Sequence, residues 1–337
     1  MSAQVTTSTR LSGRFVFAVA TLTFVLLAFA LTATLPLAMS IAIVFAFAGP
    51  HNYVEARYFL TRLPARMGRL RNFFLTSIVG VVTLTISMPV VLKSAAWFDL
   101  SATAALILIG GWNTLLILWC TTLVVLRSRQ APRRDWDYAI PVGFAVAGTV
   151  WLQPIALPLL LVFLHPLMGL WVLDRELASS RPEWLGVFRT ALLAIPLLVV
   201  LLWMSPTLSS DAVLFDIPER IQRQLSRHVG SNLLRGLNPN KLIATHAFLE
   251  LIHYGVWIVA IPLASRRTVL SSVEGMPLAR RSGRTRTLLR ALVLFAAFVV
   301  LLLWGAFTID YATTRDIYFT VATAHVLAEV PFLLRLL

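Results

Sequence analysis

Five of the six histidines lie inside apolar stretches, where a bilayer would surround them. In one stretch His246, Glu250 and His253 occupy positions i, i+4 and i+7, so a helix would carry all three on one face. An ionisable side chain at the centre of a bilayer costs about 2.5–3.5 kcal/mol on insertion scales, and it needs partners there. We therefore expect this face to point into the interior of a helix bundle and to serve a function.

Two more histidines each precede a glutamate by four residues, His51 before Glu55 and His325 before Glu329. Each pair shares one face of a helix if the helix continues through it. At about 1.5 Å of rise per residue, His165 and Glu329 lie about 14–18 Å from the outer ends of their stretches, as do Glu250 and His253. These groups can meet in one layer near the middle of the bilayer if their helices face each other.

Imidazole and carboxylate without thiolate suit iron, manganese or zinc, and open-sided sites of this kind are typical of non-haem iron. The single cysteine, Cys120, permits neither a disulfide within the chain nor a thiolate metal site. The predicted cofactor is iron, with haem bound by a histidine pair as an alternative. The predicted metal ligands are His51, His165, His246, His253 and His325, and the predicted catalytic or orienting carboxylates are Glu250 and Glu329.

The composition requires a membrane to hold these groups. Hydrophobic residues make up 58% of the 337 residues and charged residues 13%, against about 45–50% and 25% in soluble domains. We predict an all-α, polytopic bundle of about ten transmembrane helices that forms a single integral membrane domain, 1–337. The expected helices are 15–33, 36–53, 73–92, 102–126, 138–152, 154–173, 186–205, 241–263, 289–309 and 317–337.

Loop charges predict the orientation. With the N-terminus in the cytoplasm, 22 of the 29 lysines and arginines face the cytoplasm, as the positive-inside rule requires. Both termini are then cytoplasmic, in a multi-pass protein of the inner (plasma) membrane. The basic segments 54–72 and 264–288 face inward, the first as an interfacial helix, and 206–240 forms an outer loop with an interfacial helix over 217–235. These arginines lie in short loops, which favours contact with membrane lipids over binding of nucleic acid.

The order of the histidine-bearing segments resembles that of the bacterial Brp/Blh family, membrane enzymes that cleave β-carotene with histidine-bound iron. The resemblance is carried by GPHNYVEARYF, with His51 and Glu55, by ATHAFLELIHYGVW, with His246 and His253, and by the single histidines His165 and His325. The acid is Glu where the family has Asp, and the paired histidines are seven residues apart where the family has four. The resemblance implies a type of reaction, not β-carotene as the substrate.

The leading hypothesis is a membrane metalloenzyme that oxidises a hydrophobic isoprenoid or lipid substrate. One alternative is a proton-coupled transporter that uses Glu250 and Glu329. Another is a non-catalytic or haem-binding subunit of a membrane complex, with partners in that complex.

Overall fold

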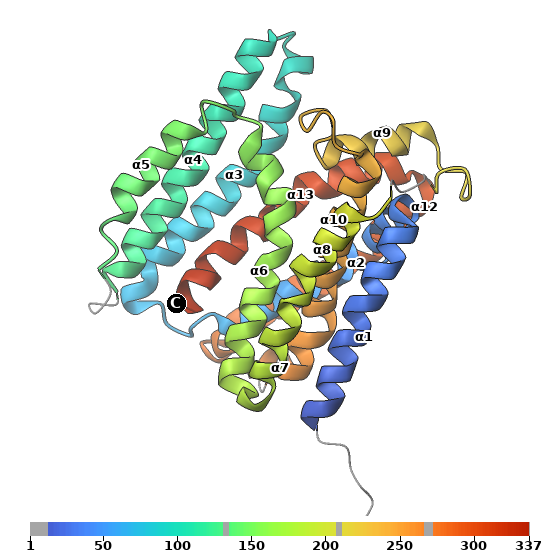
Figure 1. Cartoon of the computed structure of the whole chain (residues 1–337). Coiled ribbons are helices and arrows are strands. Elements are labelled where there is room, and N and C mark those ends of the chain that lie inside the picture. The colour runs from blue at the N-terminus through green and yellow to red at the C-terminus, as the bar shows by residue number, and fades with distance from the viewer. Residues whose placement is uncertain (1–12, 131–134, 207–210, 266–271, 337) are drawn as a thin grey trace, which may run out of the picture.

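The computed structural model describes residues 13–130, 135–206, 211–265 and 272–336, and these residues form an all-helical bundle (Figure 1). Within them, nine helices are long and apolar enough to cross a membrane. The α-helices are α1 Gly13–Thr34, α2 Pro36–Arg62, α3 Arg71–Trp97, α4 Ala102–Ser128, α5 Ala139–Thr149, α6 Ala156–Ser180, α7 Pro182–Leu192, α8 Ala194–Met204, α9 Glu219–His228, α10 Pro239–Gly255, α11 Ile261–Ala264, α12 Gly283–Ile309 and α13 Tyr311–Leu336. Helices α7 and α8 form one span, and α10 and α11 form another through a π-helical turn at Val256–Ala260.

Each of the ten apolar stretches forms helix, which confirms the predicted fold class. The stretch 138–152 forms α5, whose eleven residues extend about 16 Å, short of a hydrocarbon core of about 30 Å. Helix α5 lies beside α4 and leads back toward the start of α6 (Figure 1). Helices α3, α4 and α5 form a group of neighbours at one side of the molecule, joined to the rest mainly through α13.

Helix α2 is longer than its apolar run. It continues past Pro50 to Arg62, so residues 54–62 extend this helix and do not form the separate interfacial helix expected for 54–72. The reason is burial: Glu55 and Tyr58 lie inside the bundle, and their packing stabilises the helix beyond its apolar run. Because α2 is unbroken here, Glu55 stays on the face that carries His51.

Helix α10 is the most enclosed element. Each residue from Lys241 to Tyr254 is buried, and α1, α2, α6, α8 and α9 pack around the helix. Peripheral helices show the opposite pattern, with large apolar side chains such as Leu294 and Phe295 of α12 on the outside. This arrangement suits a lipid surround, where apolar groups face outward and polar groups must find partners inside.

The outer segment 206–240 and the basic segment 264–288 lie only partly within the described residues. In the outer segment the predicted helix forms as the shorter α9. Its apolar side packs on the bundle, where Leu225 and Val229 contact a cluster that includes Leu242. The carboxylate of Asp211 accepts hydrogen bonds from the first backbone N–H groups of α2, the favourable place for a negative charge on a helix.

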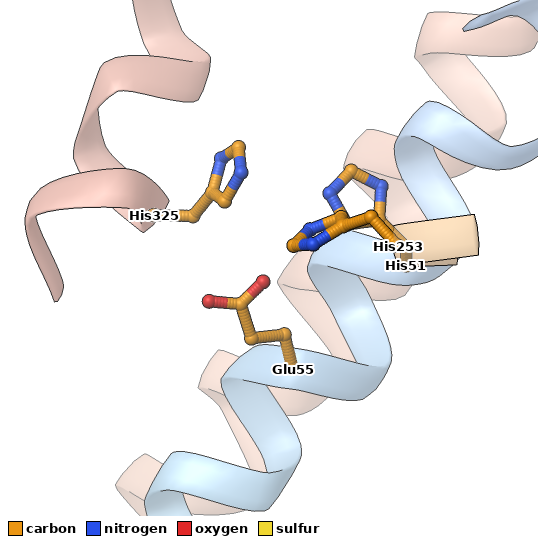
Figure 2. A group of neighbouring side chains, drawn as sticks. All are labelled: His51, Glu55, His253 and His325. Carbon is orange, nitrogen blue, oxygen red and sulfur yellow. The ribbon is translucent and has the colours of Figure 1, made fainter. Parts of the chain in front are cut away.

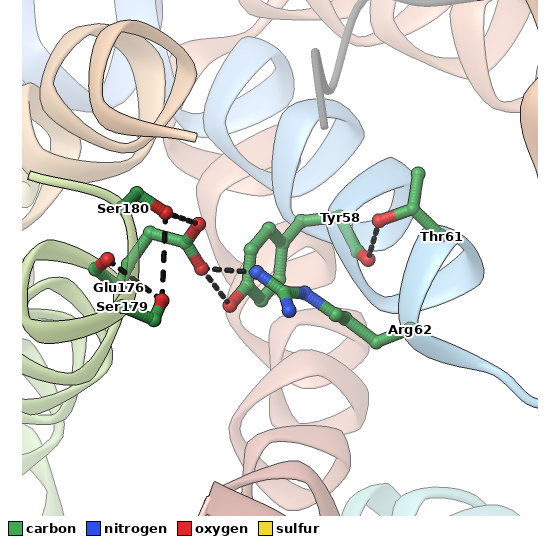
Figure 3. A network of polar contacts seen from close by, with 6 residues as sticks. All are labelled: Tyr58, Thr61, Arg62, Glu176, Ser179 and Ser180. Carbon is green, nitrogen blue, oxygen red and sulfur yellow. Dashed lines mark hydrogen bonds and ion pairs between the residues drawn. The ribbon is translucent and has the colours of Figure 1, made fainter. Parts of the chain in front are cut away.

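A polar network ties α2 to α6 (Figure 3). Glu176 of α6 is buried, and its carboxylate pairs with Arg62 and accepts a hydrogen bond from the Tyr58 hydroxyl at 3.1 Å. The Ser180 hydroxyl donates to the other oxygen at 2.9 Å. A buried carboxylate with charged and neutral donors on both oxygens fixes the two helices against each other. These two helices carry His51, Glu55 and His165.

Candidate metal centre

Four helices bring four histidines to one place: His51 of α2, His165 of α6, His253 of α10 and His325 of α13. The ring centroids of His51 lie 5.5 Å from His253 and 5.1 Å from His325. Those of His165 lie 4.6 Å from His253 and 4.9 Å from His325. Each ring therefore has two imidazole neighbours within the cluster.

The surroundings of each ring determine which nitrogen faces the centre. His51 Nδ1 lies 3.1 Å from the Phe47 carbonyl oxygen, and His253 Nδ1 lies 3.2 Å from the Pro166 carbonyl oxygen. A carbonyl at Nδ1 holds the proton there, which leaves Nε2 with its lone pair. Neither Nε2 has a hydrogen-bond partner among the described residues. The Nε2 lone pairs of His51 and His253 are thus available to bind a cation.

His165 follows the same pattern with a carboxylate. Its Nδ1 lies 3.1 Å from Glu329 Oε2, and its Nε2 lies 3.1 Å from Nε2 of His325. Carboxylate, histidine and metal in a row is a common arrangement around metal ions, because the carboxylate orients the ring and raises its basicity. Glu329 thus stands where an orienting carboxylate would.

A second carboxylate, Glu55, points at the rings of His51, His253 and His325 (Figure 2). Its side chain is fully buried, and neither of its oxygens has a hydrogen-bond partner among the described residues. An unpaired carboxylate in such a place is costly unless a cation compensates it. One divalent ion would balance the charges of Glu55 and Glu329 together.

The ligand atoms fall into two overlapping sets. One donor atom each from His51, Glu55, His253 and His325 lie within 4.8 Å of one another, and the same holds for His165, His253 and Glu329. Two ligands bound to one ion at about 2.0–2.2 Å can be at most about 4.4 Å apart. That limit applies to ligands on opposite sides of the ion, and neighbouring ligands lie closer together. The side chains of either set would therefore move inward around an ion, and the residue types and their proximity fit a metal.

Four of the five predicted metal ligands gather here, and Glu329 joins them. The structure does not bring His246 and Glu250 into either set. They lie further out along α10 with each other, His246 Nδ1 at 3.6 Å from Glu250 Oε2. Glu55, marked in the sequence only by its spacing from His51, takes the place expected for Glu250.

The sequence did not single out Gly169 of α6, the glycine that lets α10 pack closely against α6. A Cβ atom at Gly169 of α6 would lie 3.1 Å from His253 Nδ1 and 3.2 Å from Trp257 Nε1. Only a residue without a side chain lets the two helices approach this closely without displacing the histidine. The i, i+4 spacing of Gly169 from His165 was the available signal.

Fold and cluster together define a multi-pass membrane helix bundle with a buried His/Glu cluster that could hold a metal ion. The chain matches no protein-family model, no curated protein and no solved structure.

Proposed function

We propose that this protein is a membrane metalloenzyme that uses non-haem iron to oxidise a hydrophobic substrate of the isoprenoid or lipid class. The observation that carries the proposal is the orientation of the imidazoles. His51, His165 and His253 each have Nδ1 against a backbone carbonyl or a carboxylate, and each contributes to one of the two ligand sets, which share His253. Histidines that only pack in a core do not need this common orientation.

The donor set favours iron. Imidazole and carboxylate ligands without thiolate suit iron, manganese and zinc, and iron of this type activates oxygen. Cys120 packs partly buried among the side chains of α3 and α4, in a different cluster from that of α10, and supplies no ligand to either set. The protein's own residues would hold the ion, orient His165 through Glu329 and exclude water with an apolar surround.

An apolar cavity of about 200 Å³ supports the substrate class. It lies between α1, α6, α7, α8 and α10, and Thr21 is the one polar side chain in its lining. Leu170 and Ile252 line it, and they directly adjoin Gly169 and His253 in sequence. A hydrocarbon chain in this cavity can therefore lie against the same turns of α6 and α10 that carry Gly169 and His253. The Brp/Blh-like histidine pattern supports an isoprenoid among such chains.

One observation favours the transporter alternative. Glu250 accepts a hydrogen bond from Tyr254 at 2.6 Å, and the Tyr254 ring lies tilted against that of His51 with centroids 4.2 Å apart. Side chains that can carry protons thus follow one another along α10 toward the cluster, as a proton pathway requires.

Elemental analysis of purified protein tests the proposal. Wild type should contain about one iron per chain, and His253→Ala should lose most of it because an ion at this site would lose one of its few ligands. His246→Ala is the matched control, since it removes a buried histidine from the same helix but from outside both ligand sets. A metal-free wild type, or equal metal loss in both variants, would refute the enzyme and promote the transporter.

A further inference from the structure

A second buried polar group lies toward the α9 side of the bundle. It comprises His228 of α9, His246 and Glu250 of α10, and Tyr311 and Arg315 of α13, and is called the outer polar group below. The rings of His228 and His246 lie 5.0 Å apart.

Helix geometry separates His246 and Arg315 from the metal centre, whereas Glu250 lies between the two sites, about one turn from His253. Seven residues of α10 separate His246 from His253, about 10 Å along the helix axis. Ten residues of α13 separate Arg315 from His325, about 15 Å. Neither of the two ligand sets that the structure forms includes a member of the outer polar group, so a ligand held there occupies a site of its own.

Arg315 is the unusual member. Only 2% of the residue is exposed, yet none of the ion pairs among the described residues includes it. Its Nε has no hydrogen-bond partner there, and the nearby neutral Tyr311 hydroxyl, which lies within interaction range of Arg315, has no other partner there. Its guanidinium lies over the Phe319 ring, 4.5 Å from the centroid. Arginine is always charged and offers five donors, so burying it without an acceptor is costly. The arrangement fits a site that receives an oxyanion.

The groups around Arg315 limit what that anion can be. His228 adds a donor without a second charge, because burial and then the Arg315 charge lower the pKa of His228 well below its ordinary value. Glu250 lies within electrostatic range on the side toward the metal centre, with Oε1 held by Tyr254. Its carboxylate disfavours a doubly charged ligand beside it.

Helix α9 covers the outer polar group, and its positive charge favours the approach of an anion. The Gln224 side-chain amide donates to the Ala312 carbonyl oxygen at 2.9 Å, and Arg220 donates to the Thr313 hydroxyl at 3.3 Å. These few polar contacts hold α9 over α13. The helix carries Arg220, Arg223 and Arg227 against a single acid, Glu219, so its potential attracts anions.

We propose that Arg315, with His228, His246 and Tyr311, binds one singly charged oxyanion beneath α9, a carboxylate, a phosphate diester or the singly charged form of phosphate. The anion is the end of an amphiphile or a free ion, and both present the same oxygen atoms to the guanidinium. The site does not depend on the proposed metal chemistry.

Calorimetric titration of the full-length protein in neutral detergent tests the site with inorganic phosphate, decanoate and 1-decanol as probes. Wild type should bind decanoate or phosphate but not 1-decanol, which lacks the charge. Arg315→Gln should weaken that binding at least about tenfold, because it removes the buried charge that pairs with the anion. Arg290→Gln is the matched control, an arginine of α12 whose exposed side chain pairs with Glu274, and should leave binding unchanged.

Decanoate binding alone assigns an amphiphile, and phosphate binding alone assigns a free ion. Failure of both anions to bind wild type, or equal binding by Arg315→Gln, overturns the proposal. Arg315→Lys guards against misfolding, since it keeps the charge, loses the planar fork and should bind with intermediate affinity. Metal content measured on the same samples keeps the two proposals apart: a metal-free wild type that binds decanoate contradicts only the enzyme.

Discussion

His165 and His325 face each other across the bundle with their Nε2 atoms 3.1 Å apart. At that distance one nitrogen must donate a proton to the other, or a cation must hold both lone pairs. Ligands of one ion can lie up to about 4.4 Å apart, so an ion enters this pair with only a small separation of the rings. A bound ion would therefore replace the shared proton and alter this contact.

X-ray absorption of the metal-loaded protein tests whether His325 is a ligand. We expect about three imidazole nitrogens at roughly 2.0–2.2 Å in wild type, as in the larger ligand set, and about two in His325→Ala. His228→Ala serves as the control, because its ring lies in the outer polar group and should leave the count unchanged. An unchanged nitrogen count in His325→Ala would place this ring outside the metal's ligands.

The Glu55 carboxylate should destabilise the metal-free protein and strengthen metal binding. Removing its charge with Glu55→Gln should raise the melting temperature of the chelator-treated protein, because a buried unpaired carboxylate is lost. The same change should weaken metal binding about 10–100-fold, the usual cost of altering a carboxylate at a metal site. Thermal unfolding with and without metal measures both effects.

Glu183→Gln is the comparison, since Glu183 is an exposed glutamate of α7 and should change neither quantity. If Glu55→Gln destabilised the metal-free protein, the carboxylate would have a stabilising partner other than a metal ion.

The sequence predicted which residue types would meet but not all of the residues. Counting rise along helices put His165, His253 and Glu329 at one depth, and they do meet. It also put Glu250 there, but depth says nothing of rotation or tilt, and Glu250 turns to Tyr254 instead. Glu55 was harder to place because its helix had to extend beyond the apolar run, which only its burial explains.

Gly169 should be sensitive to a single methyl group. Gly169→Ala places a Cβ atom 3.1 Å from His253 Nδ1, so the ring or the helix must shift by a few tenths of an ångström. We expect about a tenfold loss of metal affinity, in the range seen for changes behind a ligand, measured by competition with a chelator. The methyl group itself should favour helix by up to about 1 kcal/mol, so folding is retained.

Gly186→Ala controls for the helix effect. Gly186 lies in α7, and a Cβ atom there meets nothing within 4 Å. Equal metal affinity in the two variants would show that the close approach of α6 to α10 does not position His253.

The network between α2 and α6 should carry stability. Glu176→Ala leaves Arg62 and Tyr58 without their shared acceptor, and we expect a loss of about 1.5–3 kcal/mol, as for hydrogen bonds to charged groups. Glu219→Ala breaks a pair whose side chains are mostly exposed and should cost less than about 1 kcal/mol. Thermal unfolding in detergent compares them, and similar losses would contradict the anchoring role of Glu176.

The helical architecture could be predicted from the sequence because long apolar stretches separated by charged loops are typical of few structures other than a transmembrane helix bundle. Nine stretches long enough to span formed long helices, and α9 followed the apolar spacing of Leu225 and Val229. The way the helices pack around α10 could not be read in this way, because its residues are buried on every side and its apolar pattern marks no preferred face.

The orientation in the membrane is the remaining prediction, and it is testable with single cysteines in a Cys120→Ala background. Asn232→Cys lies in the outer segment and Ser282→Cys in the basic segment before α12, and both native side chains are exposed. If the positive-inside rule sets the topology, an impermeant maleimide applied to intact cells labels Asn232→Cys and reaches Ser282→Cys only after lysis. Labelling of Ser282→Cys alone in intact cells would invert the bundle and place α9 and the outer polar group on the cytoplasmic side. One candidate span, α10 with α11, lies between the two positions among the described residues, so they should lie on opposite sides of the membrane. Labelling of both in intact cells would put them on the same side and would show that α10 and α11 do not cross the membrane.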